Sequence, residues 1–209
     1  MRPVLALLLM TGVPVMAQET VSPPAPAVPA AVQPKPATVR VALTTELGPI
    51  VLELEKERAP ITTGNFLRYV RDKRFDGIGF YRAVTVAPGF GLVQAGIRDG
   101  RKTYPNIPHE PTTRTGLTHG DGTISMARAA PGSAVADWFI MIGASPAMDA
   151  NPAAPGDNLG FAAFGRVVEG MEIIRQIQAA PTDPNQGEGV MKGQMIAKPV
   201  KILTARVVE

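Results

Sequence analysis

Few residues in this sequence have side chains suited to chemistry. The absence of cysteine excludes disulfides, cysteine nucleophiles and thiolate metal sites. The two histidines, His109 and His119, lie in a Pro- and Thr-rich connection, and we interpret both as exposed loop residues. Because two histidines are too few for a multi-histidine centre, we expect no bound metal, and no motif calls for a cofactor.

Nucleophile and phosphate-binding motifs are also missing. Residues 143–147 read Gly-Ala-Ser-Pro-Ala, which lacks the second glycine of a Gly-x-Ser-x-Gly elbow. Each Gly-x-Gly pair, such as Gly77 with Gly79, lacks the third glycine of a dinucleotide-binding loop. A hydrolase built on histidine or zinc is therefore disfavoured, and what remains is one arginine among apolar residues.

That arginine is Arg82, in the segment Phe-Tyr-Arg-Ala-Val at residues 80–84. A guanidinium stays protonated and presents its donors in a planar fork, so neighbouring acceptors can hold it while one N–H points at a substrate. Taken alone, a strand arginine is ordinarily a solvated surface residue, and the apolar residues in the segments that follow it are ordinarily core. The interpretation depends on the elements that bring these residues together.

Alternating apolar residues predict strands. Residues 39–43 and 50–54 both alternate with period two around the turn Leu-Gly-Pro at 47–49, which predicts a hairpin with one buried face. Further strand-like segments recur with turn residues between them. They are Ile78–Val84, Gly91–Ala95, Thr123–Arg128, Trp138–Gly143, Phe161–Val168 and Pro199–Val208. Together these make about eight strands, the number at which side chains just fill a closed barrel.

Two helices are expected beside the strands. Pro60 opens the first, whose apolar residues recur at helical spacing up to Lys73 and Arg74. The second follows Glu169-Gly170 and is ended by Pro181. The sequence therefore predicts an all-β fold, a closed eight-stranded antiparallel β-barrel with two capping α-helices, although periodicity alone leaves a sandwich open.

The first residues predict export. Arg2, an apolar run over 4–10 and Val-Met-Ala at 15–17 are typical of a signal peptide, with cleavage near Ala17. An uncleaved anchor is disfavoured because a membrane span needs about 20 apolar residues. Residues 18–37 are a Pro/Ala-rich flexible linker, and 38–209 form the folded domain. We expect a periplasmic or secreted protein with no stable membrane span after signal cleavage.

The charge pattern excludes one class of partner. The net charge of +3 results from 21 Lys and Arg against 18 Asp and Glu, and these residues are spread along the chain. Nucleic-acid binding proteins concentrate cations on one face or in blocks, so we expect no nucleic-acid partner. The oligomeric state is not readable from the sequence.

Five segments, taken in order, carry a resemblance to a known family. They are Phe80–Val84, Pro88–Gly96, Gly122–Ala129, Asp137–Ile140 and Phe161–Val167. In this order they resemble the cyclophilin family of peptidyl-prolyl isomerases. The resemblance extends from Val39 to the C-terminus. The resemblance implies an eight-stranded antiparallel barrel with two end-capping helices. It also implies activity without a cofactor on proline-containing polypeptides during folding.

Prolyl isomerisation explains why so few ionisable groups are needed. The X-Pro amide rotates over a barrier of about 18–20 kcal/mol, and no bond is made or broken. Rotation removes the amide resonance and leaves a localised lone pair on the proline nitrogen. A donor aimed at that nitrogen stabilises the twisted state selectively.

The resemblance assigns roles to individual residues. Arg82 matches the catalytic arginine, and Gln94 matches the glutamine that orients it. The substrate-binding residues implied in the same way are Phe90, Leu92, Ala127, Arg128, Asp137, Phe139, Met148 and Phe161. Because Gly91 is an extra residue after Phe90, the register there is uncertain by one and a bulge is expected.

Three residues depart from the family pattern around the groove, and one of them is Ala147, which stands where the family has a tryptophan or phenylalanine. Arg128 replaces an asparagine, and Asp137 replaces a glutamine. We expect Asp137 to pair with Arg82 or with Arg128. A carboxylate bound to Arg82 would occupy donors that the transition state needs, so Asp137→Gln is expected to leave kcat/KM equal or higher.

Two alternatives to an isomerase stay open. The altered rim is compatible with a catalytically weakened peptide-binding or chaperone-like module that uses the same groove. A barrel that binds a small molecule is a further possibility, which the bulky inward-facing residues disfavour.

Overall fold

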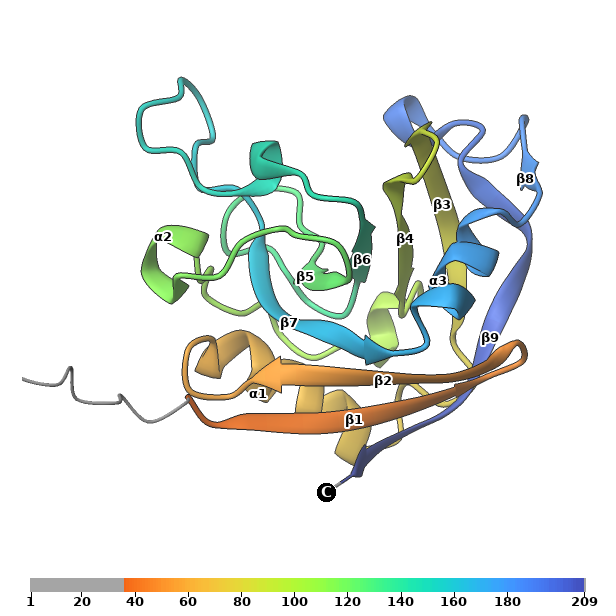
Figure 1. The fold of residues 1–209 in the computed structure, drawn as a ribbon, viewed down its shortest axis with the longest axis horizontal. Helices are drawn as coiled ribbons and strands as arrows, with labels where there is room; N and C mark the ends of the chain where they lie inside the picture. Colours follow the sequence, from red (N-terminus) through yellow and green to blue (C-terminus); the bar gives the residue numbers. More distant parts are fainter. Residues whose placement is uncertain (1–35, 209) are drawn as a thin grey trace, which may run out of the picture. The chain divides into compact units, whose positions relative to one another are not determined.

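The computed structural model describes residues 36–208, which contain nine strands and three α-helices (Figure 1). The predicted signal peptide and nearly all of the predicted linker lie outside the described residues. The strands are β1 (Thr38–Thr45), β2 (Gly48–Glu55), β3 (Gly79–Ala87), β4 (Phe90–Gly96), β5 (Thr123–Met126), β6 (Trp138–Ile142), β7 (Ala162–Glu169), β8 (Thr182–Asp183) and β9 (Met195–Val208). The helices are α1 (Pro60–Arg71), α2 (Thr112–Thr115) and α3 (Met171–Gln178).

The sheet closes on itself. Its order is β1-β2-β7-β5-β6-β4-β3-β9-β8, and β1 also pairs with β9, with Val41 opposite Val207. All the pairings are antiparallel. The predicted closed eight-stranded antiparallel barrel is thus confirmed, and the two-residue β8 is an extra strand on β9. Closure removes the exposed edges that an open sheet would present.

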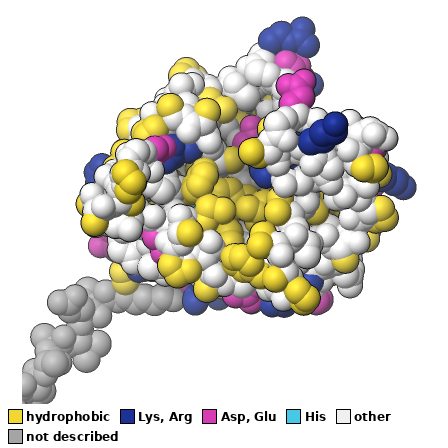
Figure 2. Space-filling model, turned by 90° about the horizontal axis from the view of Figure 1, so that it is seen from above, with side chains coloured by type: hydrophobic (Ala, Val, Ile, Leu, Met, Phe, Trp, Pro, Cys, Tyr) yellow, Lys and Arg dark blue, Asp and Glu magenta, His cyan; other side chains and the backbone are white. Residues whose placement is uncertain are grey.

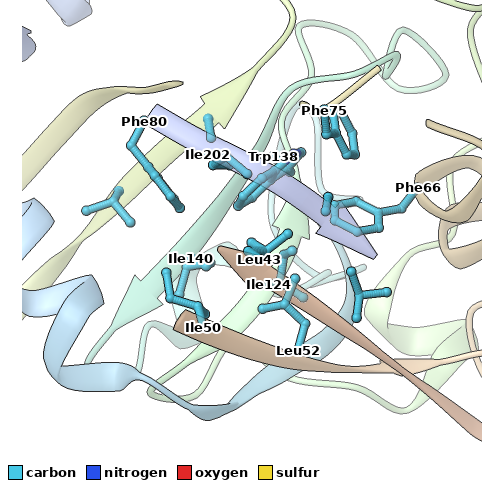
Figure 3. Packing of buried hydrophobic residues seen from close by; sticks show 14 of the residues in the cluster. Leu43, Ile50, Leu52, Phe66, Phe75, Phe80, Ile124, Trp138, Ile140 and Ile202 are labelled. Atoms are coloured by element: carbon cyan, nitrogen blue, oxygen red, sulfur yellow. The ribbon is translucent and has the colours of Figure 1, made fainter. Parts of the chain in front are cut away.

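The barrel interior is filled by aliphatic and aromatic side chains (Figure 3). Trp138 is fully buried, and its ring centroid lies 5.5 Å from that of Phe80 and 5.7 Å from that of Phe66. Met126 and Phe164 belong to this cluster. The cluster is rigidly packed, so the strands hold side chains on their outer faces in fixed positions.

The two predicted helices pack on the barrel. Helix α1 contacts β2, β7 and β9, whereas α3 contacts β2, β3, β4 and β6. Each buries one apolar face, which is Phe66, Leu67 and Val70 on α1 and Ile173, Ile174 and Ile177 on α3. Among residues 36–208, no helix combines the length and hydropathy needed to cross a bilayer.

The start of α1 is capped by a residue from a distant loop. No side chain at the N-cap residue Ala59 hydrogen-bonds the helix. Instead, the buried carboxylate of Glu110 accepts hydrogen bonds from the backbone N–H of Thr62 at 2.7 Å and from that of Ile61 at 3.2 Å. A negative charge at this position also complements the helix dipole.

Candidate active site

A cavity of about 670 Å³ opens beside strands β3, β4 and β6. All of the predicted site residues except Phe90 line it: Arg82, Leu92, Gln94, Ala127, Arg128, Asp137, Phe139, Met148 and Phe161. Figure 2 shows hydrophobic side chains gathered in the middle of one face, with charged side chains around them. The fold therefore brings together side chains that are scattered over 80 positions of the sequence, from Arg82 to Phe161.

Phe90 does not line this cavity, although it packs against the buried cluster of Leu92, Phe139 and Met141 beside it. It begins β4 opposite Ala87, and the β3–β4 ladder is irregular between Thr85 and Ala87. The bulge that we expected in β4 after Phe90 is therefore found in the facing part of β3. From Gly91 onward β4 pairs with β6 without a shift, and Leu92 lies in the cavity wall.

The cavity floor is apolar and separate from the barrel core. Leu92, Phe139 and Met141 form a small buried cluster of their own, with Phe161 packed against it. The rings of Phe139 and Phe161 meet edge to face, with centroids 5.4 Å apart at 89°. Such a floor fits a compact apolar ring and excludes water from it.

Arg82 is held at the cavity by two glutamines. Its Nη1 donates to Oε1 of Gln94 at 2.8 Å. Its Nε and Nη2 both donate to Oε1 of Gln194, at 2.9 and 2.6 Å. Burial lowers the pKa of the guanidinium, yet arginine begins so high that it stays charged at neutral pH. Both acceptors are neutral, so the positive charge is not cancelled by an ion pair.

Gln194 was missed by the sequence analysis. It lies in the loop before β9, 112 positions after Arg82, and no local pattern distinguishes it from the other glutamines. Its neighbour Met191 and the exposed Val190 line the cavity from the same loop. A second cavity of about 380 Å³ adjoins it and shares Met191 and Arg98 with the first.

The prediction that Asp137 pairs with Arg82 or Arg128 is wrong. Asp137 Oδ1 accepts the hydroxyl of Tyr81 at 2.7 Å, and that hydroxyl accepts from Nε2 of Gln94 at 2.6 Å. Tyr81 thus lies between the carboxylate and the Arg82 site. Since Asp137 takes no donor from Arg82, the reason for expecting Asp137→Gln to preserve activity no longer applies.

Arg128 has partners of its own at the rim. Its Nη1 and Nη2 donate to the two oxygens of Asp157, at 2.5 and 3.0 Å, and its Nε donates to the Gly160 carbonyl. The guanidinium also lies 5.3 Å from the centre of the Phe161 ring. These contacts fix the loop before β7 against the cavity.

Burial controls the ionisation of Asp137. Desolvation raises its pKa above the ordinary value, while the hydrogen bond from Tyr81 and the charge of Arg98 act in the opposite direction. Burial, followed by the nearby Asp137 charge, raises the pKa of Tyr81 far above its usual range, so the phenol keeps its proton.

His119 is not an exposed loop residue, contrary to the prediction. It is buried beneath the cavity floor, where its ring stacks on Phe139 with centroids 6.1 Å apart. Its Nδ1 lies 2.6 Å from Asp149 Oδ1 and its Nε2 lies 2.9 Å from Ser125 Oγ. His119 and Ser125 are both buried, and the contact of His119 with the cavity is through its stacking on Phe139.

His109, in contrast, is partly exposed. Its Nε2 lies 3.0 Å from the Leu159 carbonyl oxygen. Sequence reasoning could not separate the two histidines because the partners of His119 are folded onto it from other segments, one of them 30 positions away.

Comparisons with known proteins agree with this geometry. The family model described as "Cyclophilin type peptidyl-prolyl cis-trans isomerase/CLD" matches residues 40–207. Peptidyl-prolyl cis-trans isomerase A of Dickeya dadantii is 33% identical over 178 residues, covering 82% of this chain and 86% of the relative. A Streptomyces antibioticus isomerase is 32% identical over 167 residues, covering 78% and 98%.

The fold is also found among solved structures. A cyclophilin-type isomerase of Cryptosporidium parvum superposes with a TM-score of 0.62 at 18% identity, covering 83% of this chain and 99% of that one. A second structure of that protein, determined in the presence of the dipeptide Ala-Pro, gives a TM-score of 0.60 at 18% identity, covering 81% of this chain and 99% of that one.

Proposed function

The chain belongs to the cyclophilin-type peptidyl-prolyl cis-trans isomerase family, and we propose that the cavity beside Arg82 speeds rotation about X-Pro bonds in exported polypeptides. The observation that carries this proposal is the position of Arg82. Its charged fork is fixed by neutral acceptors at the wall of an apolar cavity.

The apolar floor binds the proline ring in this proposal. Leu92 and Phe139 offer hydrophobic surface and no hydrogen-bonding group, so the ring gains burial without losing polar contacts. A dry pocket also favours the twisted amide, because the twisted form is less dipolar than the planar one. The Cryptosporidium structure determined in the presence of Ala-Pro supports a proline-containing ligand for this chain.

Arg82 acts on the proline nitrogen. As the bond twists, the nitrogen lone pair becomes localised and basic, and a guanidinium N–H can donate to it. The planar amide offers no such lone pair, so the donation stabilises the transition state more than the ground state. Gln94 and Gln194 hold the fork in place, and no proton is transferred.

We further propose that the substrates are exported proteins. The N-terminal sequence supports this, because a cation, a short apolar run and Val-Met-Ala at 15–17 precede a Pro-rich stretch. Expression of the full chain in a Gram-negative host, followed by fractionation, tests the proposal. We expect a periplasmic product that begins at Gln18, whereas a cytosolic product that keeps residues 1–17 would contradict it.

A protease-coupled assay tests the isomerase proposal itself. Short peptides that share one sequence except for the residue before proline are mixed with the full chain, and the cis-to-trans rate is measured against buffer. We expect acceleration on several of them, with the profile showing which preceding residue is preferred. Binding of the peptides without acceleration of any of them would instead identify a peptide-binding module.

A further inference from the structure

Two side chains, Gln94 and Tyr81, link Arg82 to a carboxylate that does not touch it. Arg82 donates to Gln94, Gln94 donates to Tyr81, and Tyr81 donates to Asp137, at 2.8, 2.6 and 2.7 Å. Tyr81 and Gln94 are almost fully buried, so few water molecules compete for these bonds. We propose that Asp137 is a positioning residue that fixes the direction of this chain and thereby the orientation of Arg82, and that its protonation releases Arg82.

The direction of the chain follows from the chemistry of an ionised carboxylate. Ionised Asp137 can only accept, so the Tyr81 hydroxyl must donate to it. The hydroxyl oxygen is then left to accept from an amide N–H₂, which turns Nε2 of Gln94 toward Tyr81. The amide oxygen of Gln94 consequently faces Arg82, where a guanidinium needs an acceptor.

A neutral Asp137 no longer fixes the direction of these hydrogen bonds. A carboxylic acid can donate as well as accept, so the Tyr81 hydroxyl can turn round and donate to Gln94. The amide must then rotate, which brings its N–H₂ toward the donors of Arg82. Two donors facing each other repel, and Arg82 would keep only the hydrogen bonds to Gln194.

The surroundings of Asp137 make its protonation accessible. Its carboxylate lies directly against strand β4, since a Cβ placed on Gly96 would be 2.3 Å from Oδ1. The groups that face it are Tyr81 from β3 and Arg98 just after β4, and the other cations at the cavity are Arg82 and Arg128. Burial outweighs these groups and raises the pKa of Asp137 above its ordinary 3.8.

This inference rests on the proposed function, because it explains how Arg82 is held for the isomerase reaction. The pH profile of kcat/KM tests it, with a peptide that has no titratable side chain. We expect the activity of the wild type to fall as the pH drops through the raised pKa of Asp137. An Asp137→Asn variant should be about three- to tenfold less active than wild type at neutral pH, should lack this fall, and should meet the wild type at acid pH.

Tyr81→Phe separates the chain of bonds from a direct effect of the Asp137 charge. This variant keeps the ring and removes only the hydroxyl, so we expect the effect of Asp137→Asn to disappear in its background. Asp72→Asn is the matched control, because Asp72 is exposed at the end of α1 and bonded to Tyr104 outside the cavity. Equal effects of Asp137→Asn in the presence and absence of the hydroxyl would overturn the proposal.

A measurement without substrate keeps the inference distinct from the proposed function. The side-chain amide resonances of Gln94 should shift with pH in the wild type and stay constant in Asp137→Asn. If the wild type shows no isomerase turnover but these resonances shift with pH, the proposed function is wrong and the control of Gln94 by Asp137 is supported. The proposed control of Gln94 by Asp137 would be overturned if the resonances did not respond to pH in the wild type, or if they responded equally in both proteins.

Discussion

Gln194 accepts two hydrogen bonds from Arg82 through a single oxygen, at 2.9 Å from Nε and 2.6 Å from Nη2. This contact joins the loop before β9 to strand β3. It occupies one edge of the guanidinium, while Gln94 occupies Nη1. The fork is therefore held from two sides by neutral oxygens, and its full charge remains available to a ligand in the cavity.

Replacing Gln194 should weaken catalysis without harming the fold. We expect Gln194→Ala to lower kcat/KM about tenfold, because one edge of the fork is no longer fixed and each lost hydrogen bond costs about 0.5–1.5 kcal/mol. The loss should appear in kcat more than in KM. Gln186→Ala in the same loop is the control, since Gln186 bonds Asp183 and does not touch Arg82. Equal activity of the two variants would refute this role.

Glu110 should stabilise helix α1 across a long sequence distance. Glu110→Ala leaves the backbone N–H groups of Ile61 and Thr62 without their acceptor, so we expect a loss of about 1–3 kcal/mol in the free energy of unfolding. Urea denaturation measures it, with the exposed Glu188→Ala as the control. Glu110→Gln should lose less, because its amide keeps one acceptor oxygen. A loss no larger than that of the control would contradict the capping role.

His119 should make stability depend on pH. Burial lowers its pKa below the ordinary 6.5, although the Asp149 carboxylate acts the other way. Between its folded and unfolded pKa values the folded protein binds fewer protons than the unfolded chain, so stability rises with pH. We therefore expect the free energy of unfolding to fall as the pH drops below 6.5.

Variants of the two histidines identify the source of that dependence. His119→Gln should reduce the slope of stability against pH in this window, although it lowers stability at neutral pH by disturbing the floor under Phe139. His109→Gln is the matched control, because His109 bonds the Leu159 carbonyl and does not stack on Phe139. The assignment fails if the slope is unchanged in His119→Gln.

The barrel was predicted from the sequence for a physical reason, whereas most of the cavity residues were implied by the family resemblance. Period-two alternation and turn residues report which face of each strand is buried, so the strands and the two main helices were found. The cavity positions of side chains such as Leu92 and Phe139 were implied by the family resemblance, and both line the cavity. Phe90 does not line the cavity but packs against the apolar cluster at its floor, and the ladder irregularity between Thr85 and Ala87 is not encoded in hydrophobic alternation.

The polar contacts could not be predicted in the same way. Asp137 was expected to bind a cation, but Tyr81 lies between it and Arg82. Which donor reaches a carboxylate depends on tertiary geometry within about 3 Å, whereas charge pattern gives only the possible pairs. The same limit explains the burial of His119 and the unnoticed Gln194.

The most direct test of the central claim is the kcat/KM of Arg82→Ala in the protease-coupled assay, beside Arg82→Lys and the exposed control Arg114→Ala. We expect Arg82→Ala to lose about 100- to 1000-fold, the usual cost of removing one donor to a transition state. Arg82→Lys should recover part of this, because it keeps the charge but not the fork. Turnover in Arg82→Ala equal to that of Arg114→Ala, with both proteins folded, would contradict the account.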